Sequence, residues 1–318
     1  MKTVYLHMGL GKTGTTIIQK YLGKNYLALL EHGIHYIQSS GGTQGVGHQN
    51  FAKSFITKIP GYMQKTVNND ASARIAIKEE MQACKEDVVL ISSENFQLAE
   101  PEKVKCFFDS IGEKLQYKII LFVRSQDELA ESEYNQIIKV RKEERTFYNY
   151  VKSEFDGDFM RLAYKWEKVF GENNIICKVY DAKNHMALSD FFTCLPGNIN
   201  IFKNVNGSME ETSNRSLGYA QMIIKRMLNT LHPSEVKNEH VELPRNIHEV
   251  FKAIDVPALL MNSKEAKKFR DLYKKSNKKF NKRYLGIRSS ELGGRRYSAD
   301  ERNHYFQKCK DLIDIYKG

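Results

Sequence analysis

The sequence lacks the features that mark several large classes of protein. No apolar run approaches the roughly 18 residues that a membrane-spanning helix needs. The first residues, Met1–His7, carry one lysine and lead directly into glycines, which is too short and too polar for the apolar region of a signal peptide. We therefore predict a cytoplasmic protein whose chain begins with a strand.

Paired metal-ligand and disulfide patterns are also missing. The cysteine count is odd, the spacings are wide and no Cys-x-x-Cys occurs, so neither a disulfide framework nor a zinc site is indicated. His232, His240 and His248 are eight residues apart, which is no zinc-ligand spacing. We expect no metal, and we expect buried, reduced thiols at Cys84, Cys106, Cys177, Cys194 and Cys309.

The composition is that of a globular protein with an uneven charge distribution. Of the 318 residues, 41% are hydrophobic and 27% charged, and an aromatic share of 11% argues against disorder. The net charge is +11, and residues 263–318 hold 17 Lys or Arg against 7 Asp or Glu. This basic C-terminal part could meet an anionic donor, an acidic glycan, a membrane surface or nucleic acid, or could be a solvated helix face. No nucleic-acid-binding motif occurs, so nucleic acid is the least favoured partner.

Short apolar runs alternate with helical patterns along residues 1–185. Continuously apolar strands that alternate with helices are typical of a parallel sheet buried on both faces. We predict an α/β fold in three layers, a central parallel sheet flanked by helices, followed by a mainly helical part over residues 186–318. No linker is evident, so we predict a single domain, 1–318. The expected strands are 4–8, 88–92, 117–123 and 175–180, and the expected helices are 15–30, 75–85, 102–114, 129–140, 155–169, 217–231 and 264–284.

The first candidate site is the loop after the first strand, His7-Met-Gly-Leu-Gly-Lys-Thr-Gly-Thr-Thr16. A glycine loop that opens a helix presents backbone N–H groups and the positive end of the helix dipole to an anion. Lys12 adds a point charge, and Thr15 and Thr16 add hydroxyl donors on the first helical turn. An ATP-binding Walker A loop would need glycine where Leu6 stands, so that spacing is absent.

The second candidate site follows the third predicted strand. Arg124 comes directly after Ile119–Val123, at the strand end where ligands bind in open α/β sheets. Ser132 and Gln136 are four residues apart and share one helix face. Arginine offers a planar fork to phosphate oxygens and serine a further donor, so Arg124 and Ser132 could converge on one phosphate.

Together these two segments resemble the donor-binding motifs of sulfotransferases that use 3′-phosphoadenosine 5′-phosphosulfate (PAPS), with most likeness to bacterial carbohydrate-type members. The resemblance covers residues 3–140 and implies a P-loop-like fold. It implies that Arg124 and Ser132 hold the 3′-phosphate, although many members have proline near Gln126. It assigns the 5′-phosphosulfate to Gly11, Lys12, Thr13, Gly14, Thr15 and Thr16.

The resemblance also implies the chemistry. Lys12 would stabilise the leaving oxygen of an in-line displacement, by analogy with phosphoryl transfer. A general base would activate the acceptor. Glu94, at the end of the second predicted strand, and His48, in the glycine-rich loop 39–49, are both candidates, and we favour Glu94. We expect a carbohydrate or glycolipid acceptor that offers a hydroxyl or amine.

Two other functions remain open from the sequence. A small-molecule kinase would share the phosphate loop but needs the Walker spacing. A non-catalytic polyanion-binding protein would use the basic C-terminal part, which could also give peripheral contact with the inner face of a membrane. Arg295 and Arg296 could reach the donor or an acidic acceptor. The sequence does not indicate an oligomeric state.

Overall fold

The computed structural model describes residues 1–42, 47–58, 71–141, 143–181, 187–197, 216–231, 256–292 and 297–317. The chain forms two compact units, each assembled from three segments. This partition cuts across the boundary predicted near residue 185, and the single domain stays a prediction. The first unit holds Met1–Arg124, Asp158–Asn206 and Lys275–Gly294, and the second holds Ser125–Gly157, Gly207–Lys274 and Arg295–Gly318.

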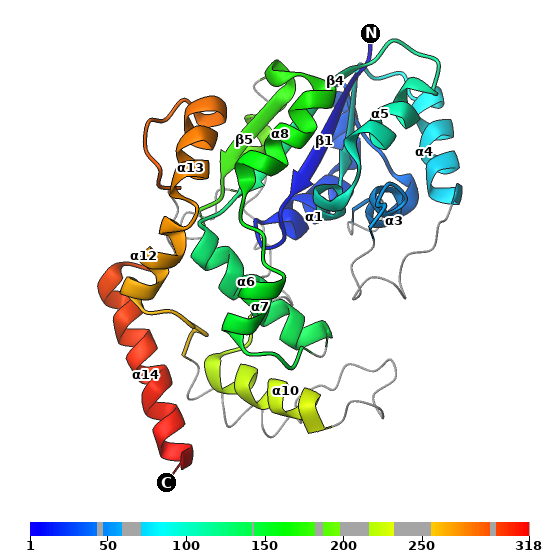
Figure 1. Ribbon diagram of the computed structural model, residues 1–318. Coiled ribbons are helices and arrows are strands. Elements are labelled where there is room, and N and C mark those ends of the chain that lie inside the picture. The colour runs from blue at the N-terminus through cyan, green and yellow to red at the C-terminus, as the bar shows by residue number, and fades with distance from the viewer. Residues whose placement is uncertain are drawn as a thin grey trace. The chain divides into compact units, whose positions relative to one another are not determined.

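The first unit contains an all-parallel sheet, as predicted (Figure 1). Its strand order is β2-β3-β1-β4-β5. The sequence did not predict β2, because three residues are too few to show a strand pattern. The strands are β1 (Thr3–Gly9), β2 (Ile34–Tyr36), β3 (Val88–Ser92), β4 (Gln116–Val123) and β5 (Ile175–Val179).

Helices cover both faces of this sheet, which confirms the three-layer α/β fold. On one face Tyr5 and Phe122 join an apolar cluster with residues of α1, α2 and α9. On the other face Tyr117 meets Phe108 of α5 and Phe170 of α8 in ring contacts. The alternation of side chains along each strand divides the apolar residues between the two faces. These helices are α1 (Thr15–Lys24), α2 (Tyr26–Glu31), α5 (Pro101–Asp109), α8 (Phe159–Phe170) and α9 (Ala187–Phe192).

The helix predicted over 15–30 is two helices in the structure. Asn25 leaves the helical region at φ −107° and ψ 27°, and its side-chain amide donates to the carbonyl of Tyr21 at 2.8 Å. An asparagine side chain that bonds the backbone competes with helix continuation. The helix predicted over 264–284 also divides, into α12 (Ser263–Asp271), α13 (Lys274–Phe280) and η6 (Asn281–Leu285).

The first unit contains several further short elements. They are η1 (Ser39–Gly41), α3 (Gln49–Lys53), α4 (Ala71–Ala83), η3 (Glu94–Leu98), η4 (Glu172–Asn174), η6 and residues 275–280 of α13.

The second unit is helical, as predicted for the C-terminal part, but it also takes in residues 125–157. Its apolar cluster joins Ala130, Tyr134 and Ile138 of α6 to Phe147 of α7 and Met222 of α10. Among the described helices, none combines the length and apolar character of a membrane span. The helices are α6 (Gln126–Arg141), α7 (Phe147–Ser153), α10 (Tyr219–Leu231), α12 (Ser263–Asp271) and α14 (Ala299–Lys317).

Candidate functional site

The loop between β1 and α1 has the backbone shape of a tight anion-binding turn. Gly14 lies at φ +82°, and Lys12, which is not glycine, lies at φ +67°. Such a conformation costs a residue with a Cβ about 1–2 kcal/mol, and strained residues of this kind gather at functional sites. At Gly9 a Cβ would lie 1.9 Å from Thr15 Oγ1, so this position requires glycine.

Hydroxyl groups close this loop from within. Thr13 Oγ1 donates to the carbonyl of Leu10 at 2.6 Å, and Thr15 Oγ1 lies 3.5 Å from the same oxygen. Thr13 and Thr15 are buried, whereas Thr16 is exposed on the first turn of α1. The structure thus gives the hydroxyls of Thr13 and Thr15 a role in holding the loop, and Thr16 has the exposed hydroxyl.

The N-terminus of α1 suits an anion. Gly14 is its N-cap, with no side-chain capping bond and no acidic residue in the first turn. The first N–H groups of a helix have no partner within the helix, and the dipole places partial positive charge there. Lys12, two residues before the cap, adds a full charge beside these dipoles.

Arg124 lies next to this loop. Strand β4 pairs with β1 so that Phe122 is opposite Gly9, and Arg124 follows two residues later. Its Nη1 donates to the backbone carbonyl of Lys12 at 3.2 Å. Strands β2 and β3, which follow β1 in the chain, lie on one side of β1 within the sheet, and β4 and β5 lie on its other side. The β1 and β4 ends therefore form the topological switch point where open α/β sheets bind ligands.

Tyr180 is a neighbour of both segments that the sequence reasoning missed. Its N–H donates to the carbonyl of Val123 at 2.7 Å, and the Arg124 guanidinium lies 5.6 Å from the centre of its ring. A Cβ on Gly14 would come 3.2 Å from Tyr180 Cε2. The available signal was position, because Tyr180 directly follows β5 and therefore lies at the carboxyl edge of the sheet.

Glu94 lies on a turn that polar contacts hold firmly. It opens η3 directly after β3, is half-buried, and follows the N-cap Ser93, whose Oγ accepts from the N–H of Asn95 at 3.2 Å. Gln49 Oε1 accepts from Ser93 Oγ at 2.9 Å and from Asn95 Nδ2 at 2.7 Å. These bonds fix the backbone on both sides of Glu94 at the carboxyl end of a sheet strand.

His48, the other candidate base, is bonded to backbone groups through both of its ring nitrogens. Its side chain is fully buried, Nδ1 accepts from the N–H of Ser92 at 3.1 Å, and Nε2 donates to the carbonyl of Ile37 at 2.9 Å. Burial lowers the pKa of this imidazole against weaker opposing contacts from the backbone. With both ring nitrogens bonded to backbone, His48 has no site left for an acceptor proton, and the structure does not favour it as the base.

A second buried histidine lies beneath the same edge. His7, on β1, pairs through Nδ1 with Ser92 Oγ at 2.8 Å, and Gln19 of α1 donates to that hydroxyl at 3.2 Å. Rings of Phe122 and Phe191 contact the imidazole edge to face. Complete burial lowers the His7 pKa to about 3, so the ring is neutral at physiological pH.

Ser132 lies on α6, in the second unit, half-buried. Its pairing with Arg124, which ends the first unit, therefore stays a prediction from the sequence. Gln126, at the start of α6, is buried and donates through Nε2 to the carbonyl of Gly157 at 3.1 Å. Five further residues named from the sequence lie outside the described residues: Arg295, Arg296, His232, His240 and His248.

One group in the described chain has the residue types of a metal site. Ligand atoms of His35, Cys84 and Glu86 lie within 4.8 Å of one another. The His35 ring already has carboxylates on both nitrogens, Glu80 at 2.8 Å and Glu86 at 3.3 Å. The Cys84 thiol donates to the carbonyl of Met81 at 3.3 Å. These protein contacts account for the cluster, and we assign no ion to it.

No protein-family model matches the chain, and no curated protein matches it. Solved structures do match. A sulfotransferase from Alicyclobacillus acidocaldarius is 13% identical with a TM-score of 0.41, over 81% of this chain and 94% of that one. Mouse sulfotransferase SULT7A1 complexed with PAP is 15% identical with a TM-score of 0.39, over 86% and 84%.

A retinol dehydratase in complex with androsterone and inactive cofactor PAP is 11% identical with a TM-score of 0.30, over 98% of this chain and 81% of that one. All three scores lie below 0.5, so no residue role is transferred from these proteins to this one.

Proposed function

We propose that this protein is a sulfotransferase that moves a sulfuryl group from PAPS to a hydroxyl or amine of an acceptor. The donor carries a 5′-phosphosulfate and a separate 3′-phosphate, so it needs two anion-binding groups. The loop around Lys12 and the guanidinium of Arg124 supply two such groups at the ends of neighbouring strands. The hydrogen bond between Arg124 Nη1 and the Lys12 carbonyl is the observation that carries the proposal.

In this proposal each group has a distinct task. Backbone N–H groups of Gly11–Thr16 hold the 5′-phosphosulfate at the start of α1. Arg124 holds the 3′-phosphate through its guanidinium, whose planar fork suits phosphate oxygens. Ser132 adds a hydroxyl to that phosphate, a role that rests on the sequence pattern alone.

The transfer forms one sulfur–oxygen bond to the acceptor and breaks another to the 5′-phosphate. Lys12 stabilises the negative charge that grows on the leaving oxygen, which becomes part of adenosine 3′,5′-bisphosphate (PAP). A carboxylate oxygen of Glu94 takes the acceptor proton. The positive charge required comes from Lys12, Arg124 and the helix N-terminus, so the proposal includes no metal.

For the acceptor we propose a carbohydrate or glycolipid. The basic C-terminal part would favour an acidic glycan or an anionic membrane surface. Its charge is not one surface in a single unit, because residues 275–294 belong to the first unit and residues 263–274 and 295–318 to the second. We propose no nucleic-acid partner.

Nucleotide binding tests the donor assignment first. Calorimetry with PAP, adenosine 5′-monophosphate (AMP) and ATP should rank PAP well above the other two, since only PAP carries a 3′-phosphate. Tight ATP binding with weak PAP binding would support a small-molecule kinase and contradict the proposal.

Transfer of labelled sulfate from PAPS to a panel of polysaccharides and glycolipids tests the reaction. We expect turnover by the unaltered protein and much slower turnover by Lys12→Ala. If neither protein turns over PAPS and both bind heparin equally well, the chain is a polyanion-binding protein and the enzyme proposal fails.

A further inference from the structure

The second unit contains a buried network of charged side chains that the proposed chemistry does not use. Arg302, in the first turn of α14, is 4% exposed, and Asp127 and Glu131 of α6 are 2% and 6% exposed. Charged side chains are seldom buried so fully unless they are paired. The network is therefore a specific arrangement, and its geometry indicates what it holds in place.

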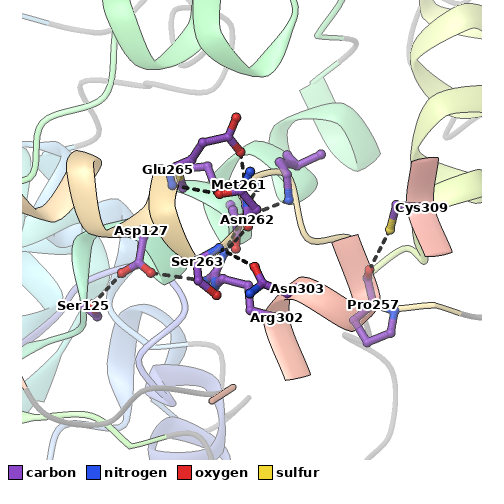
Figure 2. A network of polar contacts seen from close by, with 12 residues as sticks. Ser125, Asp127, Pro257, Met261, Asn262, Ser263, Glu265, Arg302, Asn303 and Cys309 are labelled. Atoms are coloured by element: carbon purple, nitrogen blue, oxygen red, sulfur yellow. Dashed lines mark hydrogen bonds and ion pairs between the residues drawn. The ribbon is translucent and has the colours of Figure 1, made fainter. Parts of the chain in front are cut away.

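Arg302 joins two successive turns of one helix. Nη2 lies 3.2 Å from Asp127 Oδ2, and Nη1 donates to Glu131 Oε1 at 2.8 Å. Asp127 and Glu131 are four residues apart and therefore share a face of α6. Figure 2 shows the Asp127 carboxylate between Ser125 and Arg302, and the Ser125 hydroxyl donates to Asp127 Oδ1 at 2.5 Å. A planar fork between two carboxylates restricts the rotation of α6 about its axis more closely than the ammonium group of a lysine would.

Other contacts hold the fork itself in place. Nη1 of Arg302 also donates to the carbonyl of Met261 at 2.9 Å, and the N–H groups of Leu260 and Met261 donate to Glu131 Oε1. The start of α14 is capped, because Ser298 Oγ accepts from the N–H of Glu301 and the Glu301 carboxylate accepts from the N–H of Ser298. Arg302 thus has a fixed backbone on one side and two fixed partners on the other.

Ser132 directly follows Glu131 on α6. An α-helix turns by about 100° per residue, so the face of Asp127, Glu131 and Asn135 lies beside the face of Glu128, Ser132 and Gln136. Asn135 extends the fixed face by exchanging two hydrogen bonds with the backbone of Leu217, at 2.8 and 2.9 Å. Rotation of α6 would redirect the Ser132 hydroxyl, and these contacts oppose that rotation.

We propose that Arg302 is a positioning residue for the donor nucleotide, which it serves by holding α6 so that Ser132 can bond the 3′-phosphate. The inference rests on the proposed function, because it uses the role given there to Ser132. Arg302 itself does not touch the donor in this proposal.

The test compares two ligands that differ by one group. PAP and AMP share the adenosine and the 5′-phosphate, and only PAP has the 3′-phosphate. The ratio of their dissociation constants measures what the 3′-phosphate contributes to binding. A variant that is merely less folded weakens both ligands equally and leaves the ratio unchanged. Burial raises the pKa of Glu131 to about 7, with Arg302 opposing, so the measurements are made at pH 8, above this pKa in the unaltered protein.

We expect Ser132→Ala to lower the preference for PAP by about tenfold, the loss of one hydrogen bond to a charged group. Arg302→Met should lower it by a similar factor, Arg302→Lys by less, and the double variant Arg302→Met/Ser132→Ala by no more than either single change. Such non-additivity is expected when two residues act through one interaction.

The matched control is Arg145→Met, which removes ion pairs with Glu143 and Glu154 in the same unit. It should lower stability and leave the preference for PAP unchanged. If Arg302→Met does not fold, Arg302→Lys and Glu131→Gln replace it, and both should reduce the preference.

Two negative results are distinguishable. If the unaltered protein does not prefer PAP to AMP, the proposed function fails and the inference fails with it. If the unaltered protein and Ser132→Ala differ as expected but every folded Arg302 and Glu131 variant keeps the full preference, the proposed function stands and the positioning role of Arg302 is overturned.

Discussion

Each unit contains a buried polar cluster, and the two clusters are in opposite chemical states. In the first unit His7 and His48 are fully buried, and burial lowers the pKa of both, which favours their neutral forms. In the second unit Arg302 is buried against the carboxylates of Asp127 and Glu131. A neutral hydrogen-bonded network supports a backbone without adding charge near an anion site, whereas an ion-paired fork fixes the rotation of a helix. The difference teaches that the first unit shapes the loop and the second orients a helix.

The largest expected effect tests whether the chemistry belongs to the first unit. Lys12→Ala should lower kcat for sulfuryl transfer by roughly 10²–10³-fold, the usual cost of removing one donor from a developing charge. Single-turnover kinetics with PAPS measure it. Lys20→Ala is the control, since Lys20 is exposed on the same helix, α1. Equal rates in both variants would remove Lys12 from the mechanism.

The second prediction concerns the neutral histidines. The pKa of His7 falls from 6.5 to about 3 on folding, so below pH 6.5 the unfolded chain binds a proton that the folded unit does not. Stability is fully present above pH 6.5 and is lost as the pH falls towards 3, at about 1.4 kcal/mol per pH unit, or about 3 kcal/mol by pH 4.5. His7→Asn should remove this part of the slope.

The single tryptophan makes this measurement specific to one unit. Trp166 is fully buried in the first unit, so its fluorescence during urea unfolding reports that unit alone. The exposed His32→Asn is the control for loss of an imidazole. A pH slope that is the same in His7→Asn and in the unaltered protein would show that His7 is not the group responsible.

A smaller effect distinguishes binding of the donor's 3′-phosphate from binding of its 5′-phosphate. Arg124→Ala should raise the KM for PAPS by about 10- to 100-fold, since hydrogen bonds to charged groups contribute about 1.5–3 kcal/mol. The affinity for AMP should change much less, because AMP lacks the 3′-phosphate. If PAP and AMP weaken by the same factor, Arg124 supports the loop through the Lys12 carbonyl and does not bind the 3′-phosphate.

The smallest effect concerns backbone strain at the loop. At φ +67° glycine is favoured over a residue with a Cβ, and its greater freedom in the unfolded chain offsets part of that gain. Lys12→Gly should therefore be more stable than Lys12→Ala by about 1 kcal/mol in urea unfolding, with sulfuryl transfer strongly slowed in both variants. Equal stability would mean that the loop relaxes when the lysine side chain is removed.

Much of the fold could be predicted from local sequence pattern. The runs at 4–8, 88–92, 117–123 and 175–180 all became strands of the parallel sheet. Strand β2 was missed because the three residues Ile34–Tyr36 are too few to show the alternation that identifies a strand. The break of the first helix at Asn25 was missed because one side-chain bond to the backbone decides it.

The candidate site was predicted in part. Lys12 and Arg124 could be found because each follows a strand, and the carboxyl ends of parallel strands share one edge. The environment of His48 could not be judged in this way, because the pattern around it is the same whether its ring faces an acceptor or the backbone of Ile37 and Ser92. Tyr180 also follows a strand, so its place at this edge could be predicted, but its contacts with Gly14 and Arg124 could not.

By itself the sequence determined the alternation of strands and helices and a glycine loop with a lysine at the start of a helix, because periodicity and backbone torsions are local properties of the chain. Only the tertiary structure decided that β4 lies beside β1, that His48 is saturated by backbone bonds, and that Arg302 joins Asp127 and Glu131 across more than 170 positions of sequence. Strand order, burial and ion pairing depend on residues far apart along the chain, and no local pattern contains them.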